Sequence, residues 1–461
     1  MSNLTVQKLP KGCVAFLTLG CKVNSYETNA MEQLFLEAGY ELTEFHKKAD
    51  IYVINTCTVT NMADRKSRQM LHRAKKMNPE AVIVAAGCYV QASAEEVKKD
   101  TSIDVIIGNN QKKQIVSLVE EYQKERQEAK EKLEVASLVD MKEPQDYEEL
   151  SIENAGEKTR AYIKIQDGCN QFCSYCIIPY VRGRIRSRSE EDILAEVKRL
   201  SEHGYKEVVL TGIHLSSYGV DLQGEKNFIL LEGKPLLSII RKVSEVEGIE
   251  RIRLGSLEPR IVTESFVEEL SKIEKVCPHF HLSLQSGCDE TLKRMNRKYT
   301  AKEYREGCDI LRKYFEHPAI TTDVIVGFPE ETKEEFETTK AFLEEIAFSD
   351  VHIFKYSMRK GTVAAKNPNQ IPESIKHDRS SQLIELGKRM QNTYEAAFLN
   401  REEKVLVEEL VTIDGKEYYT GYNERYVKFA IPSEEGMEDL HNKIVTVKVT
   451  GNGLAILSGI Y

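Results

Sequence analysis

The sequence contains no run of about 18 consecutive apolar residues, which a membrane-spanning helix would require. Its first residues, MSNLTVQKLPKG, also lack the apolar segment of a secretory signal peptide. These absences exclude the membrane-spanning and secreted classes, and we expect a cytoplasmic protein with no membrane partner. In that reducing compartment the ten cysteines are poor candidates for disulfide bonds. Cysteines at motif spacing there more often bind a metal or take part in catalysis.

An excess of basic residues is absent too. The chain has 64 Lys and Arg against 73 Asp and Glu, a net charge of -9, which excludes a uniformly basic surface for nucleic acid but allows a local basic patch. Long polar tracts are scarce and no internal repeat is found, so the composition, 41% hydrophobic, is that of a folded protein. A length of 461 residues predicts about three domains.

Residues 11–121 predict a doubly wound α/β domain. Short apolar runs alternate there with amphipathic stretches: VAFLTL, IYVIN, VIVAAG and IDVIIG. Three of these runs are followed closely by Cys21, Cys57 and Cys88. A single buried cysteine is more often a small hydrophobic residue than a ligand. Because the carboxyl ends of parallel strands share one edge of a sheet, however, we expect these three thiols to meet in space.

The rest of the chain predicts two further domains. Residues 122–155 are charged and lack a steady apolar period, which indicates a linker or a solvated helix. Residues 156–389 contain about six strand–helix units beginning at AYIKIQ, which predict a partial parallel barrel with its active site at the carboxyl ends of the strands. Residues 390–461 have short β-branched and aromatic runs typical of a small antiparallel β domain.

The strongest motif is the C-x3-C-x2-C spacing of Cys169, Cys173 and Cys176, just after the first predicted barrel strand. Structural zinc sites use four ligands, and no fourth Cys or His lies at motif distance. An iron–sulfur cluster on three thiolates leaves one iron open to a small molecule. A zinc site with a distant fourth ligand is the alternative.

This motif, in this place, resembles the radical S-adenosylmethionine superfamily. The resemblance implies a 4Fe-4S cluster whose open iron binds S-adenosylmethionine, with Tyr175 near the adenine. The strand-end motifs LTGIH, SLQSG and VIVGFP resemble the sites for the amino group, ribose and adenine; each could instead be a strand end that needs a glycine for a turn. The residues concerned are Thr211, Gly212, Ser283, Gln285, Val326 and Gly327.

Together with the amino-terminal cysteines, the motif resembles the methylthiotransferases, a likeness that spans nearly the whole chain. It implies a second 4Fe-4S cluster on Cys21, Cys57 and Cys88 and a carboxyl-terminal TRAM domain. One S-adenosylmethionine would methylate a sulfur on that auxiliary cluster and a second would yield the radical that activates the substrate. A sulfur donor and an electron donor such as flavodoxin are also implied, while catalytic residues beyond the cluster ligands stay unknown. The cysteines that match no ligand position, and that we expect to be structural, are Cys13, Cys277, Cys288 and Cys308.

Two basic runs lie beside the cysteine motifs and predict contacts with tRNA phosphates. The alternative is a solvated surface. The residues are Arg182, Arg184, Arg186 and Arg188 in the first run, and Arg65, Lys66 and Arg68 in the second.

Within the family, TLGCKVNSYET around Cys21 most resembles the MtaB group, which modifies N6-threonylcarbamoyladenosine at position 37 of the tRNA anticodon loop. The isopentenyladenosine group typically has Gln-Met in place of Lys22 and Val23, and the group acting on a ribosomal-protein aspartate has Pro-Lys. Those two substrates are the alternatives inside the family. A non-catalytic, metal-stabilised RNA-binding protein is the alternative from another class.

Overall fold

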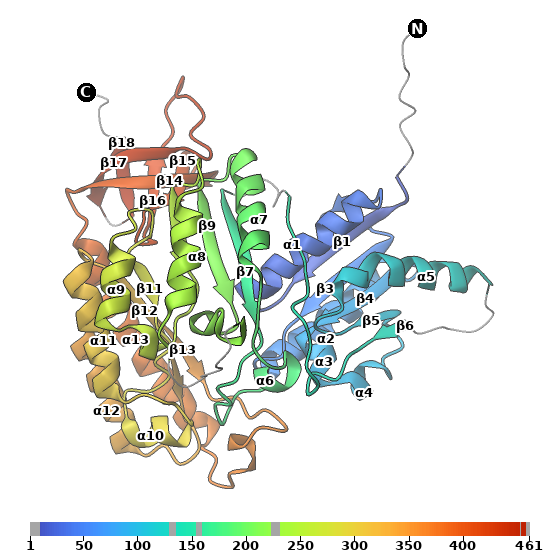
Figure 1. The fold of residues 1–461 in the computed structure, drawn as a ribbon, viewed down its shortest axis with the longest axis horizontal. Coiled ribbons are helices and arrows are strands. Elements are labelled where there is room, and N and C mark those ends of the chain that lie inside the picture. Colours follow the sequence, from blue (N-terminus) through green and yellow to red (C-terminus); the bar gives the residue numbers. More distant parts are fainter. Residues whose placement is uncertain (1–9, 129–134, 154–158, 223–230, 452, 458–461) are drawn as a thin grey trace. The chain divides into compact units, whose positions relative to one another are not determined.

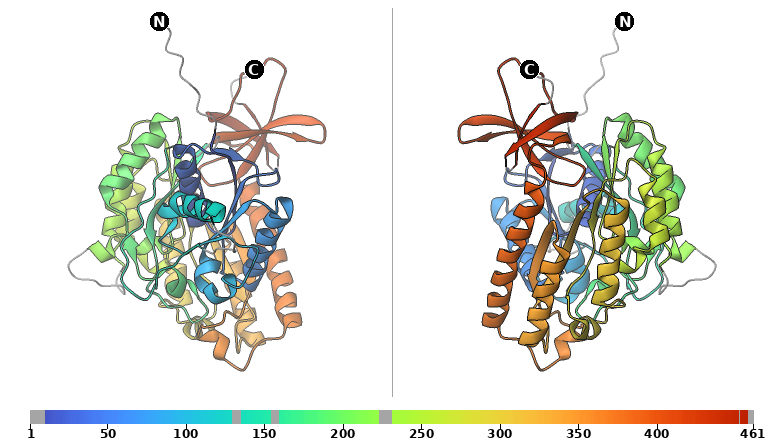
Figure 2. Two further views of the ribbon diagram at one scale, coloured as in Figure 1. Left: turned by 90° about the vertical axis from the view of Figure 1, so that its right-hand side faces the viewer. Right: turned by 90° about the vertical axis from the view of Figure 1, so that its left-hand side faces the viewer.

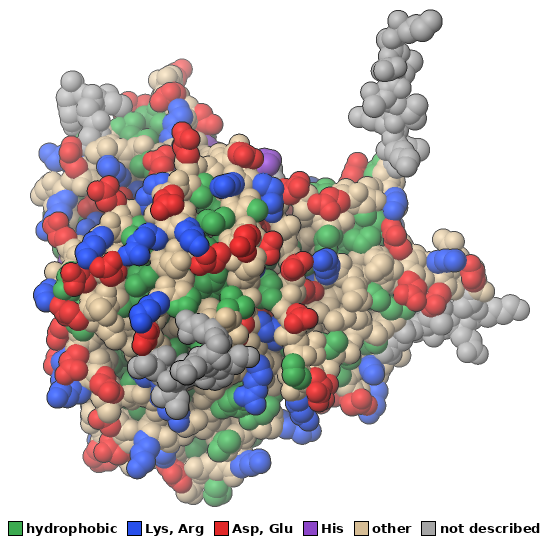
Figure 3. All heavy atoms as spheres, in the orientation of Figure 1, with side chains coloured by type: hydrophobic (Ala, Val, Ile, Leu, Met, Phe, Trp, Pro, Cys, Tyr) green, Lys and Arg blue, Asp and Glu red, His purple; other side chains and the backbone are tan. Residues whose placement is uncertain are grey.

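The structure is a computed structural model that describes residues 10–128, 135–153, 159–222, 231–451 and 453–457 (Figure 1). The chain forms two compact units: residues 1–154 with 176–186, and residues 155–175 with 187–461. Acidic and basic side chains are interspersed over the face shown in Figure 3, so this face carries no uniformly basic surface. No helix among the described residues is both long and apolar enough to cross a membrane.

The first unit is built on a six-stranded parallel sheet with strand order β2-β1-β3-β4-β5-β6. Its strands are β1 Cys13–Thr18, β2 Glu41–Thr43, β3 Ile51–Thr56, β4 Val82–Gly87, β5 Val105–Ile107 and β6 Val135–Ser137. Its helices are α1 Lys22–Glu37, α2 Asn61–Met77, α3 Cys88–Ala92, α4 Ala94–Val97, α5 Ile115–Glu128 and α6 Ile178–Val181. The predicted doubly wound α/β domain is confirmed.

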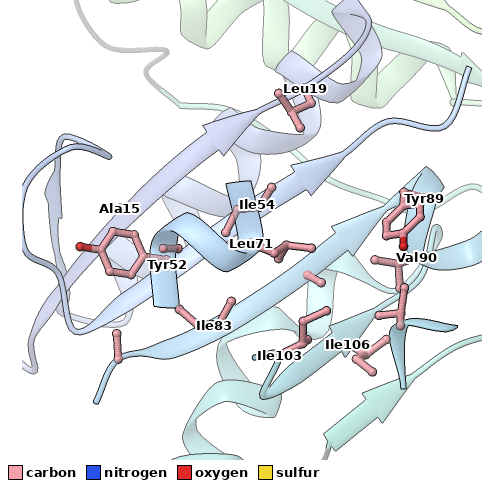
Figure 4. Packing of buried hydrophobic residues seen from close by; sticks show 14 of the residues in the cluster. Ala15, Leu19, Tyr52, Ile54, Leu71, Ile83, Tyr89, Val90, Ile103 and Ile106 are labelled. Atoms are coloured by element: carbon pink, nitrogen blue, oxygen red, sulfur yellow. The ribbon is translucent and has the colours of Figure 1, made fainter. Parts of the chain in front are cut away.

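Strands β3 and β4 are buried along their whole length, because helices cover both faces of the sheet. On one face, Ile54, Leu71, Ile83 and Val90 belong to one apolar cluster contributed by β3, α2, β4 and α3 (Figure 4). A second cluster, which includes Phe35 of α1, fills the other face. The two cores hold the carboxyl edge of the sheet rigid.

The segment predicted as a linker or solvated helix is partly structured. Helix α5 continues through it to Glu128, and β6 adds a strand at the sheet edge. The prediction missed β6 because its three residues lie within a charged stretch. Residues 129–134 and 154–155 of the predicted linker lie outside the described residues, and the predicted domain limits stay predictions.

The second unit contains the predicted partial barrel, made of two sheets in the orders β10-β9-β7-β8 and β11-β12-β13. Bridges at Ile252–Val276 and Leu257–Leu282 connect the two sheets. The strands are β7 Arg160–Asp167, β8 Arg186–Ser187, β9 Glu207–Gly212, β10 Arg251–Leu254, β11 His279–His281, β12 Ala319–Val326 and β13 Asp350–Lys355. All six predicted strands are present, and short β8 is an addition.

Helices connect these strands and cover the outer side of the sheets (Figures 1 and 2). They are α7 Glu190–Glu202, α8 Lys234–Ser244, α9 Glu264–Ser271, α10 Asp289–Arg294, α11 Ala301–Tyr314, α12 Lys333–Ile346 and α13 Glu373–Ala396. Helices α11 and α12 each begin with a capping box, at Thr300 and Thr332.

The last part of the chain forms a small closed β barrel with strand order β14-β15-β16-β18-β17. Its strands are β14 Glu402–Ile413, β15 Lys416–Tyr422, β16 Lys428–Pro432, β17 Ile444–Gly451 and β18 Leu454–Leu457. All pairs are antiparallel except β16 with β18, which pair in parallel at Ala430 and Leu454. The predicted antiparallel β domain is therefore confirmed, with one parallel closure.

Three arginines attach this small barrel to the amino ends of the larger barrel's strands. Arg251 Nη1 donates to the carbonyl of Tyr422 at 3.0 Å, and the guanidinium groups of Arg160 and Arg253 lie 4.7 and 4.8 Å from the centre of the Tyr426 ring. Arg253 also pairs with buried Glu207 at 2.8 Å. The small domain thus packs at the edge opposite the carboxyl ends of the strands.

Candidate active site

Three cysteines of the first unit follow three neighbouring strands of its sheet. Cys57 comes directly after β3 and Cys88 directly after β4, while Cys21 is the N-cap of α1 after β1. The chain leaves β1 and β3 toward opposite edges of the sheet, and such a reversal in strand order opens a crevice for ligands. We refer to these three residues as the auxiliary cysteines.

Close backbone contacts bring the loops of the auxiliary cysteines together. Gly20 has a φ of +104°, and a Cβ atom there would lie 2.9 Å from the Sγ atom of Cys57. Asn24 Nδ2 donates to the carbonyls of Leu19 at 2.7 Å and Thr56 at 3.0 Å. The loops after β1 and β3 are therefore tied to each other, and only glycine fits at position 20.

The auxiliary thiols interact electrostatically, and Cys57 and Cys88 are buried while Cys21 is exposed. Desolvation raises the pKa of Cys57 to about 11, with smaller contributions from Cys88 and Cys21. Their sulfur atoms are not among the described sets of three ligand atoms within 4.8 Å of one another. Sulfurs on one tetrahedral zinc would lie about 3.8 Å apart. The described positions of the three sulfur atoms are therefore wider apart than a single tetrahedral ion requires.

Cys169 and Cys173 lie on the loop after β7 and receive N–H donors. The backbone N–H of Gln171 points to Sγ of Cys169 at 3.5 Å, and Arg297 Nη1 donates to Sγ of Cys173 at 3.2 Å. Desolvation raises the pKa of Cys169 to about 12. Cys176 continues the same loop and opens the segment that packs with the first unit. We call these three the loop cysteines.

Thr211 and Gly212 end strand β9 beside the start of the cysteine loop. A Cβ atom on Gly212 would lie 2.8 Å from Oε1 of Gln166, a fully buried side chain of β7. The same oxygen accepts from the backbone N–H of His214 at 2.8 Å, and Gln166 Nε2 donates to the carbonyl of Gly168 at 2.7 Å. Gly212 therefore permits a close contact that fixes the loop's first residues.

Ser283 and Gln285 follow β11. The carbonyl of Ser283 accepts from Arg297 Nη2 at 3.2 Å and from the Tyr299 hydroxyl at 2.5 Å. Gln285 has a φ of +70° and bridges to Val324 of β12. Arg297 thus connects the cysteine loop to the strand end after β11.

Val326 ends β12, and Gly327 follows with a φ of +70°. The Gly327 N–H donates to Glu331 Oε2 at 2.7 Å, and a Cβ atom on Gly327 would overlap the Lys376 side chain. This glycine is therefore required by the backbone and by packing, whatever else it does.

Tyr175 packs against an apolar cluster at the same strand ends. Its ring stands edge-on to Phe328 at 6.3 Å, and Tyr356 and Ile325 belong to the same cluster. The structure thus brings the predicted residues from β9, β11 and β12 to the carboxyl edge of one barrel. Whether they bind S-adenosylmethionine stays a prediction.

Two family models match the chain. The one described as the radical SAM superfamily matches residues 163–343, and the one described as uncharacterized protein family UPF0004 matches residues 13–108. The threonylcarbamoyladenosine tRNA methylthiotransferase MtaB of Bacillus subtilis (strain 168) is 41% identical over 441 residues, which cover 95% of this chain and 94% of that protein. The chain belongs to the radical S-adenosylmethionine methylthiotransferase family.

Other methylthiotransferases are similar over much of the chain. MtaB of Aquifex aeolicus (strain VF5) is 40% identical, covering 88% of this chain and 97% of that protein. A tRNA-2-methylthio-N(6)-dimethylallyladenosine synthase of Clostridium tetani (strain Massachusetts / E88) is 35% identical, covering 98% and 96%. Among solved structures, the radical S-adenosylmethionine methyltransferase TsrM of Kitasatospora setae aligns with a TM-score of 0.54 and 12% identity, covering 77% of each chain, a likeness of fold alone.

Membership of the methylthiotransferase family implies a 4Fe-4S cluster and S-adenosylmethionine as cofactors. The donor sets fit such a cluster, because each offers three thiols rather than the four ligands of a closed zinc site. N–H groups directed at Cys169 and Cys173 would stabilise the thiolate charge when the group is bound.

Arg182 of this methylthiotransferase lies beneath the auxiliary cysteines rather than at the surface. Its Nε donates to Sγ of Cys88 at 3.2 Å, its Nη1 pairs with Glu27 at 2.9 Å, and its Nη2 donates to Asn24 at 2.7 Å. Lys112 pairs with the same carboxylate at 3.0 Å. Two buried cations thus share one buried anion, leaving an excess of positive charge beside the thiols.

The prediction that all four alternating arginines contact RNA is wrong for three of them. Arg182, Arg186 and Arg188 are 0%, 5% and 4% exposed. Gly183, with a φ of +71°, turns the chain, so the arginines do not line one side of an extended strand. Arg188 pairs with buried Glu196. These guanidinium groups cannot meet a phosphate at the surface, whereas Arg184 is exposed and its RNA contact stays a prediction.

The second basic run lies on α2, which begins shortly after Cys57. Arg65 and Lys66 are exposed, and Arg68, also exposed, donates to the Tyr89 hydroxyl at 3.4 Å. Val59 and Met62 beside them are 53% and 70% exposed. Contact of these basic residues with RNA stays a prediction, although their exposure allows it.

Sequence reasoning missed His214, Arg297 and Arg260 near the loop cysteines. Desolvation, followed by the charges of Arg297 and Arg260, lowers the pKa of His214 to about 3. Its Nδ1 bonds with the Ser217 hydroxyl at 2.6 Å, while its buried Nε2 has no partner among the described residues. His214 belongs to the LTGIH motif at the end of β9, so the sequence contained a signal that it lies near the site. No such signal marks Arg297, because it is far from Cys173 in the sequence.

The four cysteines expected to be structural have no place in either thiol set. Cys277, Cys288 and Cys308 are buried, and Cys13 Sγ donates to Asp50 Oδ2 at 3.4 Å. Their structural role stays a prediction.

Proposed function

We propose that this enzyme adds a methylthio group to C2 of N6-threonylcarbamoyladenosine at position 37 of tRNA. The observation that carries the proposal is the 41% identity over 95% of the chain to a threonylcarbamoyladenosine tRNA methylthiotransferase, against 35% for the dimethylallyladenosine synthases. The residues Lys22 and Val23 after the first auxiliary cysteine support the same group.

The loop cysteines would hold one 4Fe-4S cluster and the auxiliary cysteines a second. When bound, the first supplies the electron that cleaves S-adenosylmethionine to a radical. Buried Cys88 with the positive charge of Arg182 supports the assignment of the second cluster, because a buried thiolate needs compensating charge.

The chain's own residues would bind and orient S-adenosylmethionine at the strand ends. Thr211 and Gly212 would face its amino group, Ser283 and Gln285 its ribose, and Val326 and Gly327 its adenine, with the Tyr175 ring packed beside the base. The apolar cluster of Tyr175, Phe328 and Tyr356 would exclude water from this part of the site. Arg297 would hold Cys173 and the Ser283 carbonyl in fixed positions.

The tRNA partner would be recognised at its anticodon loop, where an unstacked base can leave the helix and enter a site. Exposed Arg65 and Lys66 support phosphate contacts, and the exposed apolar side chains of Val59 and Met62 beside them support contact with a base. Arg184 and Arg68 would add charge. An electron donor such as flavodoxin and a separate sulfur donor would complete the partners, in the cytoplasm.

The test is mass spectrometry of tRNA nucleosides from a strain that lacks this protein. We expect 2-methylthio-N6-threonylcarbamoyladenosine to disappear, with its unmethylthiolated precursor in its place, and to return when the gene is restored. Loss of the isopentenyl counterpart instead would reassign the substrate. Unchanged nucleosides with a changed ribosomal-protein aspartate would move the target to that protein.

A further inference from the structure

Two histidines and an aspartate that no part of the proposed function uses lie on adjacent strands of the second unit. His281 is on β11, Asp323 on β12 and His352 on β13. His281 pairs in register with Thr321, and Asp323 with His352. Because residues two apart on a strand point to the same face, all these side chains project from one side of the sheet.

We propose that His281, Asp323 and His352 form a site for a divalent transition metal ion such as zinc. One ligand atom from each residue lies within 4.8 Å of the other two. Nε2 of His281 is 3.3 Å from Oδ2 of Asp323, and the two imidazole rings are stacked with their centres 6.0 Å apart. Ligand atoms on a tetrahedral zinc ion at about 2.0 Å would be about 3.3 Å apart, so little movement is needed.

The second ring nitrogen of each histidine faces a polar group. Nδ1 of His281 bonds with the Thr321 hydroxyl at 2.9 Å, and Nδ1 of His352 lies 3.7 Å from the carboxylate of Asp350. Histidines that bind metals characteristically use one nitrogen for the ion and the other for a hydroxyl, carboxylate or carbonyl. The Thr321 hydroxyl thus orients His281 with its Nε2 toward Asp323, and the Asp350 carboxylate lies near the outer nitrogen of His352.

The exposure of the three side chains indicates a site with an open coordination position. His281 is 12% exposed, Asp323 30% and His352 54%. Solvent or an added ligand can therefore reach a bound ion from the His352 side. Two nitrogen ligands and one oxygen ligand suit zinc, iron, nickel or copper better than magnesium or calcium.

The site faces the same side of the sheet as the predicted cofactor site. Ile325, two residues beyond Asp323 on β12, belongs to the apolar cluster of Tyr175 and Phe328. That spacing corresponds to about 7 Å along the strand. The ion would thus be a neighbour of the radical site without sharing any of the cysteines.

An ion pair between His281 and Asp323 alone would not account for the third ligand. His352 is exposed, yet its ring stacks on His281 and its outer nitrogen faces a second carboxylate. A simple ion pair needs no third donor group at this position, whereas a metal site uses one.

The experiment uses the full chain with its iron–sulfur clusters reconstituted, so that the cysteines are occupied. After dialysis, zinc chloride is titrated by calorimetry, and zinc and iron per chain are measured by mass spectrometry. We expect one zinc per chain with unchanged iron. The variants His352→Gln and Asp323→Asn should weaken zinc binding at least about tenfold, and Thr321→Val, which removes an outer contact, about 10- to 100-fold.

The matched control is His317→Gln, because His317 stacks on Tyr394 of the same unit but belongs to no ligand set. It should bind zinc as the wild type does. The proposal is overturned if the wild type binds no zinc, or if His352→Gln and Asp323→Asn bind it as tightly as the wild type. Since His352 is exposed, its substitution should not affect folding, and unchanged iron in that variant checks this directly.

Discussion

Arg182 is the residue whose interpretation from sequence differs most from its position in the structure. In sequence it belongs to a basic run beside the loop cysteines, while in the structure it is fully buried against Cys88, Glu27 and Asn24. A buried charge is tolerated when its partners are in place, and removing one partner costs about 3–5 kcal/mol. We therefore expect Arg182 to support the auxiliary cysteines.

We expect Arg182→Gln to lower the iron content of reconstituted protein toward half, because the auxiliary thiols lose their nearest cation while the loop cysteines are unaffected. The thermal unfolding midpoint should fall as well. Arg184→Gln is the control, since Arg184 is exposed nearby. Full iron content in Arg182→Gln, measured per chain under anaerobic conditions, would contradict the assignment.

His214 gives a residue-scale prediction for pH. Its pKa is lowered from the ordinary 6.5 to about 3, chiefly by desolvation and then by Arg297 and Arg260. Below 6.5 the unfolded chain takes up a proton at this histidine and the folded protein does not, so stability falls as pH drops from 6.5 toward 3. The loss should be roughly 1 kcal/mol per pH unit within that window.

The measurement is the unfolding midpoint of wild type and His214→Gln at about pH 7.5 and about pH 5.5, which bracket the start of this window. The wild type should lose more stability than the variant between the two conditions. Equal losses of stability in the two proteins would mean that His214 becomes protonated in the folded protein as well, with its Nε2 donating a hydrogen bond.

Helix α2 is the element for which we predict contact with RNA. It starts close to Cys57 and presents Arg65 and Lys66 to solvent. We expect Arg65→Glu with Lys66→Glu to weaken tRNA binding and to reduce the slope of affinity against salt, because each phosphate contact releases a counterion. Cleavage of S-adenosylmethionine without tRNA should be unchanged.

The control for that experiment is Lys302→Glu on α11, an exposed lysine on the second unit whose side chain is 79% exposed. Binding is measured by filter retention at several salt concentrations. If both proteins bind tRNA equally, α2 is a solvated helix, which was the alternative interpretation of its charge.

At the scale of elements, strands with continuous apolar runs were predictable and short polar ones were not. Strands β3 and β4 are buried on both faces, so every residue carries the signal. Strands β2 and β6 have three residues each and depend on their neighbours in the sheet. From the sequence, a turn at Gly183 was only an alternative, because alternating arginines also suit an extended chain.

At the scale of the whole molecule, the two thiol sets should fail in different ways. Replacing the three loop cysteines with Ala should abolish the cleavage of S-adenosylmethionine and remove roughly half the iron, since each thiolate of a three-ligand cluster is needed. Replacing the auxiliary cysteines should stop methylthio transfer while 5'-deoxyadenosine still forms. The readouts are iron per chain and chromatography of both products.

Equal loss of both products in the auxiliary variant would indicate damage to folding rather than a separate site. A triple loop variant that still forms 5'-deoxyadenosine would remove the assignment of the loop cysteines.

The order of the fold types and the placement of cysteines at strand ends could be predicted from sequence, because the first depends on local patterns and the second on the rule that parallel strands end at one edge of a sheet. Cluster binding by these cysteines stays a prediction. The residues that support these cysteines could not be predicted. Arg297 reaches Cys173 and Arg182 reaches Cys88 across long stretches of chain, and no local pattern encodes such contacts. The His281, Asp323 and His352 set was invisible for the same reason, since it forms only when three strands align.

The first unit is interrupted in sequence, because residues 176–186 return to it after strand β7 has been made. During synthesis the amino-terminal sheet can form early, yet Glu27 then lacks its ion pair with Arg182, and Asn109 lacks the Val181 carbonyl to which it donates at 2.8 Å. The surroundings of the auxiliary cysteines are therefore completed only after the loop cysteines have been synthesised. We therefore expect cofactor loading at the auxiliary cysteines to follow the synthesis of the loop cysteines.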